Sequence, residues 1–149
     1  MNKTVVIGMG NPLRGDDGAG WAVVDALWAE PIEGVTAVST HQLLPEHIDM
    51  FHDAAQVIFV DASVRGVPGE VSVTALEPVT DGSVSSHHLH PEVLLALGVK
   101  IYGRMPSAQL LTITGYDFGH SENLSTPVQA AIATAVAQIR QLVDAPTSL

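Results

Sequence analysis

The sequence contains no cysteine among its 149 residues. This absence excludes a disulfide scaffold, a thiolate metal site and a cysteine nucleophile. Basic residues are also scarce, since six Lys and Arg stand against 16 Asp and Glu, for a formal charge of -10. Nucleic-acid binding requires clustered Lys and Arg, so we expect no nucleic-acid partner. The chemistry must therefore come from carboxylates, imidazoles or hydroxyls.

Long apolar runs are absent too. No run reaches the roughly 18 apolar residues that span a bilayer, and the opening MNKTVVIGMGNP lacks the pattern of a signal peptide. We therefore expect a cytoplasmic protein without membrane contacts. The hydrophobic content of 46% is ample for a core, and the length favours one domain. We predict a single domain over residues 1–144, a short tail over 145–149, and a monomer.

The order of apolar patterns predicts an α/β fold. Short β-branched runs indicate buried strands, and a run that alternates apolar with polar residues indicates a half-exposed, antiparallel edge strand. The predicted buried strands are 3–8, 35–39, 56–60 and 109–114, and the edge strand is 70–76. Helical spacing predicts helices over 17–28, 45–52, 91–97 and 126–143. We expect Thr126 to cap the last helix, with Pro127 in its first turn.

Strands that alternate with helices in this way predict a three-layer α/β/α sandwich. Its five-stranded sheet should be mixed and mostly parallel, because only the edge strand is expected to run antiparallel. In such sheets the ligands bind in the crevice beyond the carboxyl ends of the parallel strands. Polar residues at these strand ends are therefore the first candidates for a functional site.

The stretch VVIGMGNPLRGDDGAG, residues 5–20, places two adjacent acids where a glycine turn enters a helix. A phosphate-binding loop offers backbone N–H groups to an anion there, whereas Asp16 and Asp17 would repel one. Acids in a first helical turn can also simply stabilise the helix dipole, by about 0.3–1 kcal/mol. Adjacent helical residues point about 100° apart. We therefore expect the two acids to differ in role, and their spacing does not select between them.

Asp61 follows the predicted strand 56–60, at the end where the crevice should lie. Its alternative role is that of a turn former in the segment DASVRG.

Three histidines, His87, His88 and His90, crowd into the segment SSHHLHPEV. Imidazole is a common Zn or Ni ligand and the usual acid or base near neutral pH. A site with two carboxylates needs one further ligand, so we expect two of the three to be solvated. Their spacing does not indicate which one serves.

Five motifs in order resemble the hydrogenase maturation endopeptidases, which remove a C-terminal extension from the large subunit of nickel-iron hydrogenase. They are GMGNPLRGDDGAG (8–20), HQLLPEHIDMFHDAAQVIFVDA (41–62), PGEV (68–71), SSHHL (85–89) and LSTPVQAAI (124–132). The resemblance covers nearly the whole chain. It implies an endopeptidase whose partner is the nickel-loaded large-subunit precursor.

The resemblance also implies a metal-contacting and catalytic trio. The family uses the second acid of the acidic pair, an aspartate after the third strand, and a histidine after two small hydroxylated residues. These fall on Asp17, Asp61 and His87. Some members carry glutamate where this chain has Asp17. The nickel would be supplied by the substrate, and another divalent ion could bind the isolated protein.

Two mechanisms and several functions stay open at this point. The metal or a carboxylate could activate water, or repulsion between two aspartates could create an acid/base pair without metal, as in aspartic proteases. A non-catalytic nickel-binding maturation chaperone could use the same three ligands. The segment GMGNP alone also suggests a peptidyl-tRNA hydrolase, but the acidity of the chain fits a tRNA substrate poorly.

Overall fold

The computed structural model describes residues 3–79 and 89–145. The strands in this part of the chain are β1 (Thr4–Met9), β2 (Val35–Thr40), β3 (Gln56–Ser63), β4 (Val71–Leu76) and β5 (Ser107–Thr114). The helices are α1 (Ala19–Ala29), α2 (Ile48–Phe51), α3 (Pro91–Tyr102) and α4 (Thr126–Asp144). Short 3-10 turns, η1 (Gly15–Gly18) and η2 (Pro45–His47), precede α1 and α2.

The strands form one sheet in the order β2-β1-β3-β5-β4. β1 pairs in parallel with β2 and β3, and β3 pairs in parallel with β5. β4 lies at the edge and runs antiparallel to β5. The mixed, mostly parallel sheet and its antiparallel edge strand are therefore confirmed.

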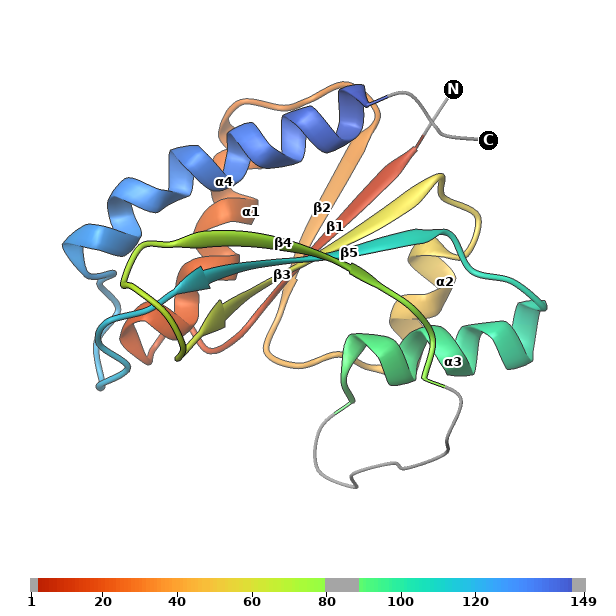
Figure 1. Ribbon diagram of the computed structural model, residues 1–149, viewed down its shortest axis with the longest axis horizontal. Helices are drawn as coiled ribbons and strands as arrows, with labels where there is room; N and C mark the ends of the chain where they lie inside the picture. Colours follow the sequence, from red (N-terminus) through yellow and green to blue (C-terminus); the bar gives the residue numbers. More distant parts are fainter. Residues whose placement is uncertain (1–2, 80–88, 146–149) are drawn as a thin grey trace.

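Helices cover both faces of the sheet, with α1 and α4 on one side and α2 and α3 on the other (Figure 1). Successive strand residues point to opposite faces, so each buried strand feeds both cores. Val6, Ile58 and Val60 pack under α1 and α4. Ile7 and Phe59 pack under α2 and α3. The predicted three-layer sandwich is confirmed.

Several predicted ends differ from the structure, and local packing explains them. The helix expected to stop at residue 97 continues to Tyr102, because Gly98 leaves room for the Met105 side chain that packs against it. It ends at Gly103, whose φ of 83° is the left-handed conformation that glycine adopts readily. β3 runs on to Ser63, so Asp61 lies within the strand and not after it.

The start of α4 is a correction. Ser125, and not Thr126, is its N-cap residue, and Thr126 is the first helical residue. The Ser125 hydroxyl makes no capping bond because it donates to Asp16 instead, at 2.7 Å. Within the described residues, none of the helices combines the length and the apolarity that a membrane span requires.

Candidate active site

The carboxyl ends of β1, β3 and β5 meet at one rim of the sheet, where the loops 10–14, 64–70 and 115–125 lie together (left in Figure 1). Hydrogen bonds join these loops to one another. The Gly115 N–H donates to the Ser63 carbonyl at 2.8 Å, and the Gly15 N–H donates to the Ser121 carbonyl at 2.7 Å. The Ser121 N–H in turn donates to the Leu13 carbonyl at 3.1 Å. The rim is thus one connected structure.

Glycines bring the two acids of the loop against this rim. A Cβ at Gly20 would lie 2.6 Å from the Val60 carbonyl oxygen, so only glycine lets α1 approach the strands this closely. Gly10 has a φ of 132°, and a Cβ there would collide with the Asp17 carbonyl oxygen. The glycines of the motif therefore seat η1 and α1 on β1 and β3.

Asp16 is buried, with 0% of its surface exposed. Its carboxylate accepts the backbone N–H groups of Tyr116, Asp117 and Ser125 at 2.7, 2.9 and 2.7 Å, and also the Ser125 hydroxyl. Burial alone would raise the pKa of Asp16, but the bonds from Asp117, Ser125 and Tyr116 outweigh it and lower that pKa. Asp16 therefore anchors the loop 115–125 and has a structural role.

Asp17 lies in the same 3-10 turn but is only partly buried. One of its carboxylate oxygens, Oδ2, accepts the Asn11 N–H at 2.7 Å. Its negative charge raises the pKa of Asp61, so the two carboxylates lie within electrostatic range of each other. The structure thus gives Asp16 and Asp17 different environments, a difference that the sequence could not predict.

Asp61 lies near the carboxyl end of β3, in register with Thr112 of β5. Burial raises the pKa of Asp61 to about 6. The hydrogen bond that the Ala62 N–H donates to it at 2.8 Å lowers this pKa, but by less than burial raises it. The charge of Asp17 adds to this increase, and the charge of His90 opposes it. Such a carboxyl group can exchange a proton near neutral pH.

Of the predicted trio, the structure places Asp17 and Asp61 within electrostatic range of each other, while His87 lies outside the described residues, as does His88. His90 is described, and it is the exposed N-cap residue of α3. The sequence left His90 as one of three candidate ligands, although its place directly before the helical Pro91 distinguishes it from the other two. Within 3–79 and 89–145, no three His, Asp or Glu side chains form a group that could hold a metal ion.

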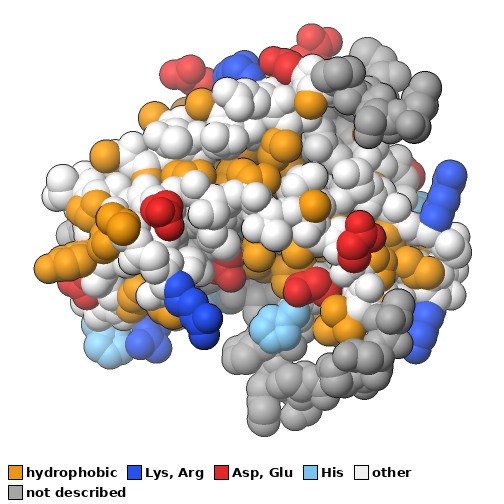
Figure 2. Space-filling view, in the orientation of Figure 1, with side chains coloured by type: hydrophobic (Ala, Val, Ile, Leu, Met, Phe, Trp, Pro, Cys, Tyr) orange, Lys and Arg blue, Asp and Glu red, His pale blue; other side chains and the backbone are white. Residues whose placement is uncertain are grey.

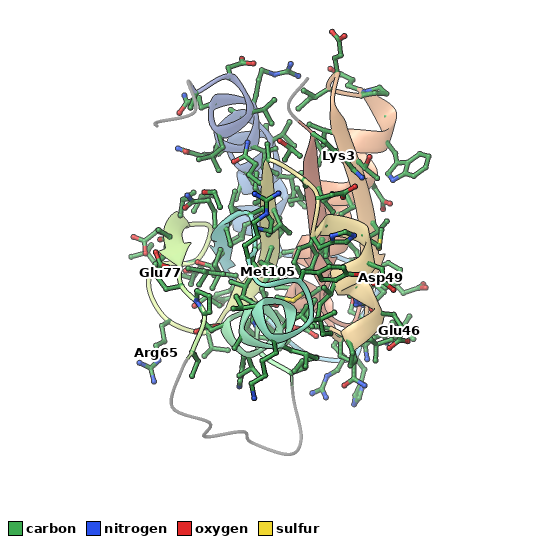
Figure 3. The ribbon with its side chains drawn as sticks, turned by 90° about the vertical axis from the view of Figure 1, so that its right-hand side faces the viewer. Lys3, Glu46, Asp49, Arg65, Glu77 and Met105 are labelled. Atoms are coloured by element: carbon green, nitrogen blue, oxygen red, sulfur yellow. The ribbon has the colours of Figure 1, made fainter. Side chains whose placement is uncertain are left out.

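A cavity of about 330 Å³ opens at the opposite end of β5, between β4 and α3. Its lining includes Glu77, Met105 and Ser107, and Figure 3 shows Met105 next to α3, above it in that view, and Glu77 at the edge of the sheet. Ser107 precedes Thr112, the partner of Asp61, by five residues, which is about 16 Å along a strand. This cavity is therefore separate from the acid pair.

Comparison with known proteins gives matches at the level of structure. No protein-family model and no curated protein sequence matches the chain. The hydrogenase maturating endopeptidase HybD from E. coli superposes with a TM-score of 0.76 and 21% identity, over 95% of this chain and 91% of that one. The hydrogenase maturation protease HycI from Thermococcus kodakarensis gives 0.74 and 21%, over 97% and 94%.

A third match is higher in sequence identity. The hydrogenase 2 maturation peptidase from a Thaumarchaeota archaeon is 27% identical, with a TM-score of 0.72 over 96% of this chain and 99% of that one. Both chains are thus covered nearly end to end. The chain therefore has the fold of the hydrogenase maturation endopeptidases, and the resemblance drawn from its motifs is supported.

Proposed function

We propose that this chain is an endopeptidase that removes the C-terminal extension of the nickel-loaded large-subunit precursor of a nickel-iron hydrogenase. The observation that carries the proposal is the pair of carboxylates, Asp17 and Asp61, at the carboxyl rim of a sheet with this fold. Peptide hydrolysis needs a group that takes a proton from water and returns it to the leaving amine. Asp61 is suited to that exchange because its pKa is raised to about 6.

Asp61 is the proposed general base. At pH 7 a carboxyl group with a pKa of about 6 is ionised in roughly nine molecules of ten. It is therefore mostly ionised and is also a stronger base than an ordinary aspartate, whose pKa is lower. It can accept a proton from an attacking water more readily. The Ala62 N–H holds one oxygen, Oδ1, which fixes the orientation of the carboxylate.

Asp17 is proposed to contact the nickel that the precursor brings. The Asn11 N–H occupies its Oδ2, so the other oxygen, Oδ1, is the one we assign to the metal. Asp61 and His87 would complete a donor set of two oxygens and one nitrogen, which suits a borderline divalent ion. Where Asp61 serves as a ligand, the ion would activate the water in place of the carboxylate base. A precursor without nickel would lack this metal contact and would not be cleaved. In the isolated protein another divalent ion could take the same place.

An aspartic-type mechanism is the rival within the same function. The charge of Asp17 raises the pKa of Asp61, which is the coupling that allows two aspartates to act as acid and base without a metal. The two mechanisms differ in whether nickel in the precursor is needed for cleavage. We further propose that the protein acts in the cytoplasm as a monomer.

The test is incubation with purified precursor, followed by mass spectrometry. Loss of a C-terminal peptide from the nickel-loaded form supports the endopeptidase, whereas binding with unchanged mass would indicate a maturation chaperone. Asp61→Asn and Asp17→Asn should each slow cleavage by about 100-fold or more. Asp25→Asn, an exposed acid on α1, removes the same charge and should cleave normally.

Two further comparisons separate the mechanisms and the histidines. Precursor without nickel should stay intact if the metal is recognised, while equal cleavage of both forms would favour the aspartic mechanism. His87→Ala should abolish most of the cleavage, and His88→Ala and His90→Ala should not. The reverse ranking would move the third ligand to another imidazole.

A further inference from the structure

Four large apolar side chains are exposed on the loops around the acid pair. They are Leu13, Val64, Val67 and Tyr116, with 56%, 78%, 68% and 72% of their surfaces accessible. We call these four residues the rim patch. Single exposed apolar residues are ordinary on protein surfaces, but several gathered beside a site mark a contact surface.

The backbone beneath the rim patch is held by hydrogen bonds from several elements. Thr114 fixes the loop that carries Val64 and Val67, because its N–H donates to the Glu70 carbonyl at 2.9 Å and its hydroxyl donates to the Arg65 carbonyl at 2.8 Å. The Tyr116 N–H is held by buried Asp16 at 2.7 Å. Since the loops are already ordered, a partner can bind them at a small cost in conformational entropy.

Two cations flank the rim patch. Arg14 follows Leu13 and Arg65 follows Val64, and both are exposed. Figure 3 shows Arg65 extending away from the body of the protein, and Figure 2 shows apolar, basic and acidic side chains at the left end of the molecule. The chain has only six Lys and Arg in all. Tyr and Arg are enriched among the residues that dominate binding energy at protein interfaces, and apolar side chains form the buried centre of such interfaces.

We propose that the rim patch docks the folded body of the protein substrate, while Asp17 and Asp61 receive the segment to be cut. This inference rests on the proposed function, and it identifies the surface that binds the substrate. The surface that fits is apolar at its centre, with acidic groups opposite Arg14 and Arg65 and basic groups opposite Glu70, Asp117 and Glu122, which are exposed acids of the same loops. A second copy of this chain fits poorly, since it would bring another charge of -10 and a second pair of carboxylates against the first.

The experiment uses charge insertion in the rim patch. Val64→Glu and Val67→Glu, singly and together, should raise the KM for nickel-loaded precursor at least tenfold and change kcat less than twofold. Arg65→Ala should raise KM about threefold. The matched control is Ile101→Glu on α3, where the native side chain is 59% exposed and remote from the rim, and its KM should stay unchanged. Unchanged thermal midpoints verify that the variants fold, and Val67→Ser serves as a milder variant.

Binding to an inactive background separates the two proposals. Asp61→Asn should capture the precursor, and adding Val64→Glu and Val67→Glu should weaken its Kd at least tenfold. If the wild-type protein cleaves the precursor and the patch variants match it in KM and Kd, the docking inference alone is wrong. If the wild type binds without cleaving, the peptidase assignment is wrong. The docking inference then stands if the Glu variants weaken the Kd at least tenfold, and it is wrong if they do not. A wild-type dimer that the Glu variants dissociate would overturn the inference in favour of self-association.

Discussion

Asp16 and Asp61 lie at the same rim of the sheet and differ in how their charges are stabilised. Asp16 is fully buried yet accepts four hydrogen bonds, and its pKa is lowered. Asp61 is less buried and, among residues 3–79 and 89–145, accepts a bond only from its neighbour Ala62, and the charge of Asp17 acts on it. Its pKa rises to about 6 as a result. Burial alone therefore does not make an aspartate reactive; burial without enough hydrogen-bond donors does.

The largest effect on stability should come from Asp16→Asn. The new amide NH₂ would point at one of the backbone N–H groups that the carboxylate now accepts, leaving a buried donor unpaired. We expect a loss of about 3 kcal/mol in the free energy of unfolding. Urea denaturation at pH 7 measures it. Asp17→Asn is the matched control, since its amide oxygen can still accept the Asn11 N–H, and it should lose less than about 1 kcal/mol.

The effect of Asp16→Asn should also depend on pH. The folded-state pKa of Asp16 lies below its ordinary value of 3.8, so its stabilising contribution is complete above that value and is lost as the pH falls through the lowered pKa. The difference in free energy of unfolding between the wild type and Asp16→Asn should therefore decrease only below about pH 4. A difference that is the same at pH 3 and pH 7 would show that the charge of Asp16 is not what stabilises the loop.

The pH dependence of cleavage tests the other aspartate. If ionised Asp61 is the base, kcat/KM reports its pKa in the free enzyme and should fall about tenfold for each pH unit below about 6. The loss reaches about 100-fold at pH 4, or about 2.7 kcal/mol in activation free energy. Circular dichroism at each pH verifies that the protein remains folded. A profile that stays flat from pH 5 to 7 would remove Asp61 from the role of base.

The fold was predictable from the sequence because its signals are local. The buried runs in β1 and β3 and the alternation in β4 each lie within a few consecutive residues. The end of α3 was missed because the glycine at position 98 looks like a stop signal, and only Met105, packed against it, shows why the helix continues.

The site was predictable only in part, because its decisive contacts join distant residues. The donors that make Asp16 structural come from positions 100 to 109 residues further along the chain. No spacing rule reaches that far, so the sequence could not separate Asp16 from Asp17. The same reason explains the missed cap: Ser125 is recruited by Asp16, and this bond is invisible in the local pattern around Thr126. The role of His87 stays a prediction.

Removing the charge of Asp61 should make the protein more stable and less active. Its pKa is raised from 3.8 to about 6, so the ionised group disfavours folding above pH 4, fully so above pH 6. Asp61→Asn should therefore gain about 1–2 kcal/mol at pH 7 and nothing below pH 4, a range reduced from the full shift because the group is partly exposed. Thermal unfolding measures it, with Asp25→Asn as the control. A loss of stability at pH 7 would show that Asp61 holds the fold together as Asp16 does.

The smallest expected effect tests whether hydrogen bonds, and not position alone, set the difference between the two aspartates. Ser125→Ala removes the hydroxyl bond to Asp16 and leaves the backbone N–H bond from the same residue. We expect a loss of about 1 kcal/mol at pH 7, because one of four donors is gone and burial is little changed. The pKa of Asp16 should rise toward its ordinary value, which NMR titration of the carboxyl group can follow, while the pKa of Asp61 should not move. Thr126→Ala, at the residue next to it, keeps all four donors and is the control. If Ser125→Ala leaves the pKa of Asp16 unchanged, the remaining backbone donors suffice on their own, and the contrast with Asp61 rests on the backbone of the loop 115–125.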